Sequence, residues 1–166
     1  MSFNNNDLAL AVSVGNLLLA RQHTLVTAES CTGGLVAALI TEIDGSSQWF
    51  DRGFVTYSNY SKQQMLGVSN QTLLDYGAVS KQIAAQMAEQ AVAHSDANVA
   101  VSITGIAGPA GGSDEKPVGT VWFGWKFTDF DDQLIQTQRQ VFSGSRAAIR
   151  MQAVRFALQG IVSKCS

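Results

Sequence analysis

The chain has 166 residues, of which 11 are Lys or Arg and 13 are Asp or Glu, so its formal net charge is −2. This length is typical of one domain that buries a core without disulfides or metals, and we expect a single domain over residues 1–166. The hydrophobic content of 46% excludes a disordered chain. The low charged content of 14% excludes a general nucleic-acid binder, because neutralising phosphates requires a surplus of cations.

Cys31 and Cys165 are the only two cysteines, and their separation favours free thiols in a reducing compartment. The first residues lack the basic segment and apolar run of a signal peptide. The uncharged stretch at residues 8–20 is too short to cross a bilayer. Two distant histidines and scattered carboxylates do not form a metal site. We therefore expect a cytoplasmic protein with no membrane partner, no metal and no cofactor.

The first half of the chain alternates helical and strand-like patterns. Apolar residues that include Leu10 and Val14 recur at helical spacing, which predicts an amphipathic helix beginning near Asn6 or Asp7. The other elements expected here are, in order, a strand over residues 24–28, a tight turn over 29–34, a buried helix over 35–40, a strand over 54–57, a helix capped by Ser58 or Asn59 and ending at Gly67, a short turn from Ser69 to Gly77, and a long helix from Ser80 to about His94.

The second half is dominated by strands. The continuous apolar run at residues 99–103 predicts a strand that is covered on both faces. A glycine-rich stretch follows at residues 104–117, and residues 120–127 and 134–142 predict a hairpin with a turn through Asp129, Asp131 and Asp132. A last helix is expected from near Ser145 to about Lys164. The order α-β-α-β-α-α-β-β-β-α indicates an α/β fold, a three-layer α/β/α domain with a mixed, partly parallel sheet.

Three predicted strand ends carry the side chains that could perform chemistry. Ligands of open α/β sheets bind beyond the carboxyl ends of the parallel strands. The polar segments that follow the three candidate parallel strands are residues 29–34, 57–62 and 104–108. Chain topology could bring these segments into one cleft.

Ser30 is the leading candidate for a nucleophile. It lies in a strand-to-helix turn, where unpaired backbone N–H groups near Cys31, Thr32 and Gly33 could bind a substrate oxyanion or a phosphate. The glycines at this turn would allow a ligand to approach the backbone. The simpler interpretation is that Ser30 or Thr32 only caps the following helix.

A nucleophilic serine needs a base. His23 and His94 are expected at the edge of the sheet opposite to the strand carboxyl ends, which disfavours a Ser-His-Asp arrangement. Lys62 follows a strand end by about one helical turn and could act as the base if burial depressed its pKa. The alternative for Lys62 is an ordinary solvated lysine.

Other groups near these segments allow rival interpretations. Cys31 is a second candidate nucleophile, although a small buried side chain is the simpler interpretation. Arg146 and Arg150 lie near the start of the last helix, where a cation opposes the helix dipole, and this indicates either an anionic partner or surface salt bridges. The glycine-rich stretch 104–113 could surround an anion through its N–H groups or serve only as a crossover.

Four segments, taken together, resemble one known family. These segments are residues 27–34 (TAESCTGG), 53–59 (GFVTYSN), 102–109 (SITGIAGP) and 119–123 (GTVWF). They are similar to the nicotinamide-nucleotide amidohydrolases, or NMN deamidases, which are homologous to the C-terminal domain of the competence/damage-inducible CinA proteins. The resemblance runs from about Leu10 to the last helix.

The resemblance implies a homodimeric α/β/α enzyme without metal or cofactor. It implies hydrolysis of the carboxamide of nicotinamide mononucleotide (NMN) to nicotinate mononucleotide and ammonia, a step of pyridine-nucleotide recycling. By motif, the Ser/Lys dyad of the family corresponds to Ser30 and Lys62. Tyr57, Thr104 and Arg146 match polar family positions that are expected to help position the substrate.

The chain departs from the family pattern at two positions. Ala110 stands where the family often has Asp, and Ser145 stands where it often has the Asp of a Gly-Asp-Arg sequence. The alternative function is a catalytically silent nucleotide-binding or regulatory paralogue on the same fold. The presence of both Ser30 and Lys62 favours the enzyme.

Overall fold

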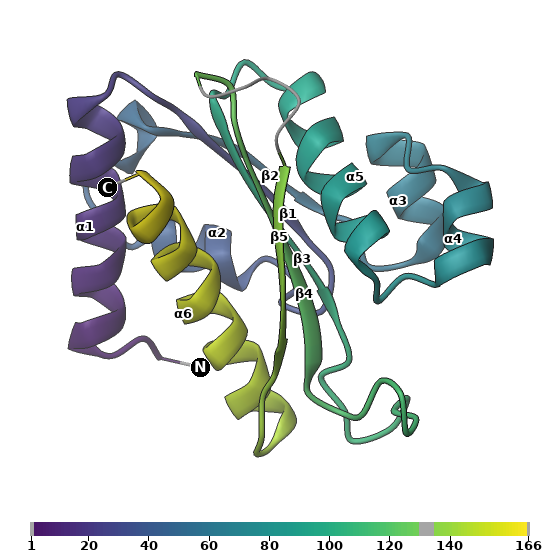
Figure 1. Ribbon diagram of the computed structural model, residues 1–166. Coiled ribbons are helices and arrows are strands. Elements are labelled where there is room, and N and C mark those ends of the chain that lie inside the picture. Colours follow the sequence, from purple (N-terminus) through teal and green to yellow (C-terminus); the bar gives the residue numbers. More distant parts are fainter. Residues whose placement is uncertain (1, 130–134, 166) are drawn as a thin grey trace.

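A mixed five-stranded sheet runs through the middle of the molecule (Figure 1). The computed structural model describes residues 2–129 and 135–165. The strands are β1 (Leu25–Glu29), β2 (Phe50–Val55), β3 (Val99–Gly105), β4 (Thr120–Phe127) and β5 (Ile135–Val141), in the spatial order β2-β1-β3-β4-β5. The strands β1, β2 and β3 are parallel, whereas β4 and β5 are antiparallel to their neighbours.

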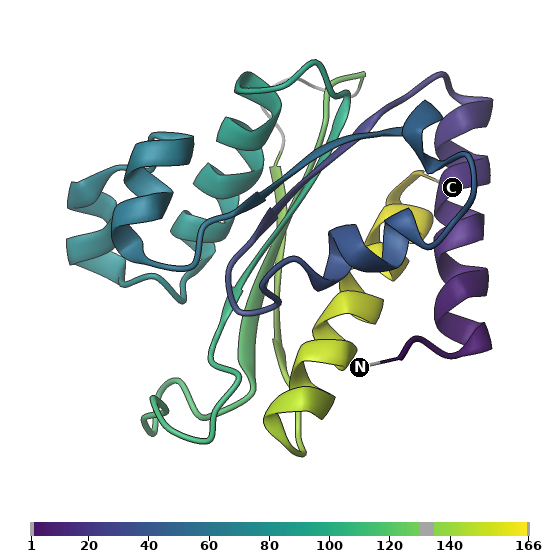
Figure 2. The ribbon, with the colours of Figure 1, turned by 180° about the vertical axis from the view of Figure 1, so that it is seen from behind.

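Helices cover both faces of this sheet. They are α1 (Asn5–Ala20), α2 (Leu35–Thr41), α3 (Asn59–Leu66), α4 (Asn70–Tyr76), α5 (Lys81–Ala93) and α6 (Arg146–Cys165), with a short 3₁₀ helix η1 (Ser46–Gln48). Figures 1 and 2 show α1, α2 and α6 on one face and α3, α4 and α5 on the other. The predicted α/β/α fold is therefore confirmed.

Two hydrophobic cores lie on the two faces, because successive side chains of a strand point in opposite directions. On β1, Leu25 packs in the core beneath α1, α2 and α6, and Val26 packs in the core beneath α5. On β3, Val99 packs in the same core as Leu25, and Ala100 packs in the same core as Val26. Burial on both faces explains the continuous apolar runs of these central strands.

The chain changes direction across the sheet at β1. It first continues to β2 on one side of β1 and later returns through α3, α4 and α5 to β3 on the other side. The carboxyl end of β1 is thus a topological switch point, where the loops after three parallel strands meet.

Two element boundaries differ from the sequence prediction. The cap of α1 is Asn4 rather than Asn6 or Asp7, and the Asp7 side chain completes the capping box from within the first turn. The second strand covers Phe50–Val55 instead of residues 54–57. This strand lies at an edge of the sheet and is largely exposed, so it tolerates charged residues that hide its pattern.

The segment after Ser69 is a helix rather than the predicted turn. Ser69 Oγ accepts a hydrogen bond from Thr72 N–H, and α4 then continues to Gly77, which ends it. Only Leu73 of this helix is fully buried, which explains why the sequence shows no amphipathic stripe.

The remaining elements follow the prediction closely. The strand over residues 120–127 is confirmed, and the last helix covers Arg146–Cys165. In the predicted hairpin, Asp131, Asp132 and Leu134 lie outside the described residues. Of the helices in the described ranges, none combines the length and apolar character needed to cross a membrane.

Candidate active site

A cavity of about 290 Å³ opens at the switch point. Its lining comes from the ends of all three parallel strands and from the start of α6. Five of the sequence-predicted site residues line it, namely Ser30, Tyr57, Lys62, Thr104 and Arg146. The structure therefore gathers residues that are distant in the chain around one space.

Ser30 and Lys62 are in direct contact in this cavity. Ser30 follows β1, and its N–H donates to Ile103 O of β3 at 2.9 Å, which holds the residue against the sheet. Lys62 lies on α3, which Ser58 caps through a capping box. The Lys62 Nζ atom lies 3.0 Å from Ser30 Oγ.

The lysine amine has two further oxygen neighbours. Lys62 Nζ donates to Thr56 O at 2.8 Å and reaches Tyr57 O at 3.5 Å. A neutral amine has two N–H groups and one lone pair. If the two carbonyl oxygens receive the N–H groups, the lone pair is directed to the Ser30 hydroxyl.

Burial favours the neutral form of the Lys62 amine. The residue is 1% exposed, so the interpretation as a solvated lysine is wrong. Desolvation disfavours the ammonium and lowers the pKa of Lys62 to about 8. Among the ion pairs found in residues 2–129 and 135–165, none joins Lys62 to a carboxylate that would restore its charge.

Glu29, rather than Ser30 or Thr32, satisfies the start of α2. Its carboxylate accepts hydrogen bonds from three backbone N–H groups, those of Gly34, Val36 and Ala37. The capping interpretation of Ser30 and Thr32 is therefore wrong, and the Ser30 hydroxyl remains free to contact Lys62. Gly34 at the N-cap has a φ of 91°, a left-handed conformation that favours glycine.

Arg150 holds the turn from the opposite side. Its guanidinium donates to Cys31 O at 3.1 Å and to Thr32 O at 2.9 Å. The N–H of Gly33 donates to Ser30 O, so this group is not available to a substrate. The N–H groups of Cys31 and Thr32 are then the donors in the turn without a protein acceptor among the described residues.

Thr32 and Gly33 do not line the cavity. Thr32 is fully buried, and its hydroxyl has no hydrogen-bond partner within the part of the chain that the structure describes. Arg150 contacts the Thr32 carbonyl oxygen, and the guanidinium lies 3.4 Å from the place where a side chain on Gly33 would begin. These two residues contribute backbone to the turn and no side chain to the cavity.

Cys31 lines the cavity but is a poor candidate for a nucleophile. The thiol is buried, and desolvation raises the pKa of Cys31 to about 12. A thiol with this pKa holds almost no thiolate at neutral pH, and the thiolate is the reactive form.

Polar groups at the mouth of the cavity form a second set of contacts. Arg146 donates to Gly108 O at 2.7 Å and to the Tyr57 hydroxyl at 2.9 Å. Tyr57 is 60% exposed and keeps its own O–H free to donate. Deeper in the cavity, Thr104 Oγ donates to Ala78 O at 2.8 Å and can still accept a hydrogen bond.

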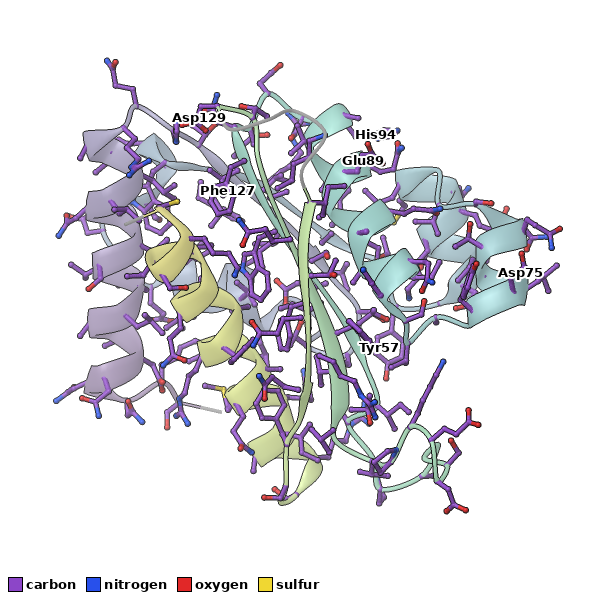
Figure 3. The ribbon with its side chains drawn as sticks, in the orientation of Figure 1. Tyr57, Asp75, Glu89, His94, Phe127 and Asp129 are labelled. Atoms are coloured by element: carbon purple, nitrogen blue, oxygen red, sulfur yellow. The ribbon has the colours of Figure 1, made fainter. Side chains whose placement is uncertain are left out.

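The two histidines lie away from this site. Figure 3 shows His94 near one end of the sheet and Tyr57 toward the other. His23 precedes β1 and contacts Asp129 at 3.2 Å, and Figure 3 places Asp129 at the same end as His94. Neither histidine lines the cavity.

The sequence does not predict the roles of three residues at this site. It indicates only a turn at Glu29, an anion-binding or surface role for Arg150, and a possible helix cap at Asn59, which lines the cavity. At the two departures from the family pattern, Ala110 lines the cavity and Ser145 Oγ accepts a hydrogen bond from Ala148 N–H at the start of α6.

No group of three or more His, Cys, Asp or Glu residues among the described residues could hold a metal ion.

Sequence comparison connects the chain with curated relatives. A nicotinamide-nucleotide amidohydrolase PncC from Enterobacter agglomerans is 56% identical over 150 residues, which are 90% of each chain. The protein of the same name from Escherichia coli K12 is also 56% identical, over 90% of this chain and 89% of its own. The one from Pseudomonas putida is 44% identical over 92% of this chain and 93% of its own.

Solved structures have the same fold. The competence/damage inducible protein CihA from Agrobacterium tumefaciens superposes with a TM-score of 0.92 at 45% identity, covering 98% of each chain. A CinA superfamily protein from Escherichia coli gives 0.90 at 37% identity, covering 99% of this chain and 94% of its own. Residues 7–165 match the model of the CinA C-terminal domain, and the chain therefore belongs to the CinA C-terminal domain family.

Proposed function

We propose that this chain is a nicotinamide-nucleotide amidohydrolase that converts NMN and water to nicotinate mononucleotide and ammonia, with Ser30 and Lys62 as its catalytic dyad. The observation that carries the proposal is the 3.0 Å contact between Ser30 Oγ and the buried Nζ of Lys62. The printed names of relatives that are 56% identical support the same reaction class.

In the first step, neutral Lys62 takes the proton of the Ser30 hydroxyl as Ser30 Oγ attacks the carboxamide carbon. The carbonyl oxygen becomes an oxyanion, and the donor proposed for it is the N–H of Cys31, which lines the cavity and has no acceptor among the described residues. Such donors contribute about 3–4 kcal/mol each in other enzymes.

In the second step, the tetrahedral intermediate collapses. The C–N bond breaks, and the Lys62 ammonium returns its proton to the leaving nitrogen, which departs as ammonia. An ester of Ser30 with the nicotinate group remains. Lys62, neutral again, takes a proton from water as the water attacks the ester, and nicotinate mononucleotide leaves while Ser30 recovers its proton.

The polar groups of the cavity fit this substrate. Thr104 Oγ can accept a hydrogen bond from the carboxamide nitrogen, since its own proton is directed to Ala78 O. Arg146 and Tyr57 present a cation and a free O–H at the mouth, where the nucleotide phosphate would lie. The proposal assigns the reaction to the cytoplasm and to a homodimer, as the family resemblance implies.

Ammonia release from NMN tests the proposal directly. The wild-type protein is expected to release one ammonia per NMN consumed, and Ser30→Ala and Lys62→Met should each lose at least about a thousandfold in kcat. Lys126→Met is the matched control, because Lys126 pairs with Glu89, which lies near His94 at the end of the sheet away from Tyr57 (Figure 3). Near-normal turnover by Ser30→Ala would refute the serine mechanism.

A catalytically silent nucleotide-binding paralogue is the second candidate. Its signature would be saturable NMN binding by calorimetry with no ammonia released by the wild-type protein. The contact between Ser30 and the buried Lys62 favours the enzyme. A buried lysine without a counter-charge destabilises the fold, so we expect one only where it has a function.

A further inference from the structure

A second cavity, of about 380 Å³, lies beside the proposed active site. It is bordered by the first turn of α5, by β4 and β5, and by the end of the loop over residues 106–117. Trp122 on β4 and Arg139 on β5 are cross-strand partners that both line it. Val79 lines both cavities, so the two spaces are neighbours.

Positive charge is concentrated around this second cavity. Lys81, Lys116 and Arg139 line it, whereas Glu115 is the only acidic residue of its lining among those that the structure describes. The whole chain has only 11 lysines and arginines and is net negative. None of the three cations forms an ion pair with a carboxylate within the described ranges.

Backbone oxygens hold two of these cationic groups in place. Lys116 Nζ donates to Tyr76 O at 3.0 Å, and Arg139 donates to Glu115 O at 3.0 Å. An ammonium has three donors and a guanidinium has five, so each group keeps further N–H donors for a ligand.

Lys81 is placed against the usual electrostatic preference of a helix. It is the first residue of α5, where the partial positive charge of the helix favours acidic side chains, and the first turn of α5 contains none. A cation at this position costs free energy that a bound anion would offset. Departures from such local rules are expected at functional sites.

The cavity also offers aromatic surface. Trp122 and Tyr76 both line it, and Trp122 is partly exposed. An aromatic side chain next to lysines and an arginine suits a ligand that combines a planar ring with a phosphate, since rings stack on indole and guanidinium groups hold phosphates.

We propose that this second cavity binds a nucleoside phosphate, with the phosphate on Lys81, Lys116 and Arg139 and the base against Trp122. Binding of this ligand would affect the first cavity through the loop over residues 106–117. Ile106 and Gly108 near the start of the loop line the first cavity, and Lys116 near its end lines the second. A ligand held by Lys116 therefore restrains a segment that also forms the wall of the proposed active site.

Calorimetric titration with AMP at about 0.1 M salt tests the proposal on the full chain. We expect saturable binding by the wild-type protein and at least a tenfold weaker affinity in the double variant Lys81→Gln/Arg139→Gln, since this variant loses two cations that would form charge-assisted hydrogen bonds with the phosphate. Lys126→Gln is the matched control, because Lys126 lies on the same strand as Trp122 and does not line the cavity. It should bind AMP normally.

Further titrations separate the parts of the ligand. Trp122→Leu should weaken AMP binding and leave the binding of inorganic pyrophosphate unchanged. The wild-type protein should bind adenosine, which lacks the phosphate, more weakly than AMP. Arg146→Ala, which alters the first cavity, should keep AMP binding. The double variant should retain basal ammonia release from NMN, so failure of the proposed reaction would leave this test intact.

Three results would overturn the proposal. The first is the absence of saturable AMP binding to the wild-type protein at about 1 mM. The second is equal AMP affinity in the wild type and the double variant, which would show that AMP binds at another site. The third is a change of oligomeric state in the double variant by sedimentation, which would show that the cations face a second copy of the chain.

Discussion

Lys62 Nζ and Ser30 Oγ lie 3.0 Å apart although 32 positions separate the residues in the chain. The contact arises because Ser30 follows β1 at the switch point and α3 starts just beyond the neighbouring strand β2. Lys62 is thus buried against backbone carbonyls, with no carboxylate paired to it among the described residues. Such an arrangement favours a neutral amine.

The rate of ammonia release should follow the protonation of Lys62. Because the pKa of Lys62 in the free protein is lowered to about 8 and the neutral form is the base, kcat/KM should rise about tenfold per pH unit below 8 and level off above it. A series of initial rates from pH 5.5 to 9.5 measures this dependence. A rate that is flat from pH 6 to 8 would contradict the assignment of Lys62 as the base.

The same pKa predicts how stability changes with pH. A lysine whose pKa is lower in the folded state releases its proton on folding, so between about pH 8 and 10.5 the unfolded chain binds more protons and stability rises with pH. The wild type should gain on the order of 2 kcal/mol relative to Lys62→Met between pH 7 and pH 10. Urea unfolding at both pH values measures the difference, and parallel behaviour of the two proteins would exclude a depressed pKa.

Sequence patterns predicted the layers, the sheet and the Ser30 and Lys62 positions, because periodicity and strand ends are local signals. They did not predict the roles of Glu29 and Arg150. Glu29 accepts three N–H groups of a helix that is seven residues long, and Arg150 reaches a turn 119 positions away. The Glu29 contacts depend on how the turn after β1 folds back onto that strand, and the Arg150 contacts depend on how α6 packs against α2. A single sequence reveals neither.

Cys31 should be dispensable for the reaction. Since burial raises the pKa of Cys31 to about 12, Cys31→Ala is expected to keep kcat within about threefold, and iodoacetamide at pH 7.5 should not inactivate the wild type. Alkylation followed by an ammonia assay measures this. Inactivation that Cys31→Ala abolishes would favour the thiol as the nucleophile.

Arg150 should act as a positioning residue. Its two hydrogen bonds fix the Cys31 and Thr32 carbonyl groups, and so hold the turn that carries the Cys31 N–H proposed for the oxyanion. Arg150→Met is expected to lower kcat by about 10- to 100-fold with little change in KM, because that N–H acts mainly in the transition state. Arg150→Lys should restore only part of the rate, since one ammonium cannot reproduce the planar pair of donors.

The control for this variant is Arg52→Met. Arg52 is exposed and pairs with its neighbour Asp51 on the edge strand, so its loss should leave both kcat and KM unchanged. If Arg150→Met instead raises KM and leaves kcat unchanged, the arginine acts in substrate binding.

Asp7 should stabilise the packing of α1 against α6. Its carboxylate is 1% exposed and accepts two hydrogen bonds from Arg155, the shorter at 2.6 Å, and this contact lowers the pKa of Asp7. A carboxyl with a lowered pKa contributes stability above its ordinary pKa of 3.8, and that stability is lost as the pH falls through the folded-state value. Asp7→Asn should therefore lower the free energy of unfolding by about 2 kcal/mol at pH 7 and by much less near pH 2.

The control is Asp51→Asn, at a more exposed ion pair, which should lower the free energy of unfolding by less than about 0.5 kcal/mol. Thermal unfolding measures both variants. Equal losses would show that the buried pair stabilises the fold no more than the exposed one.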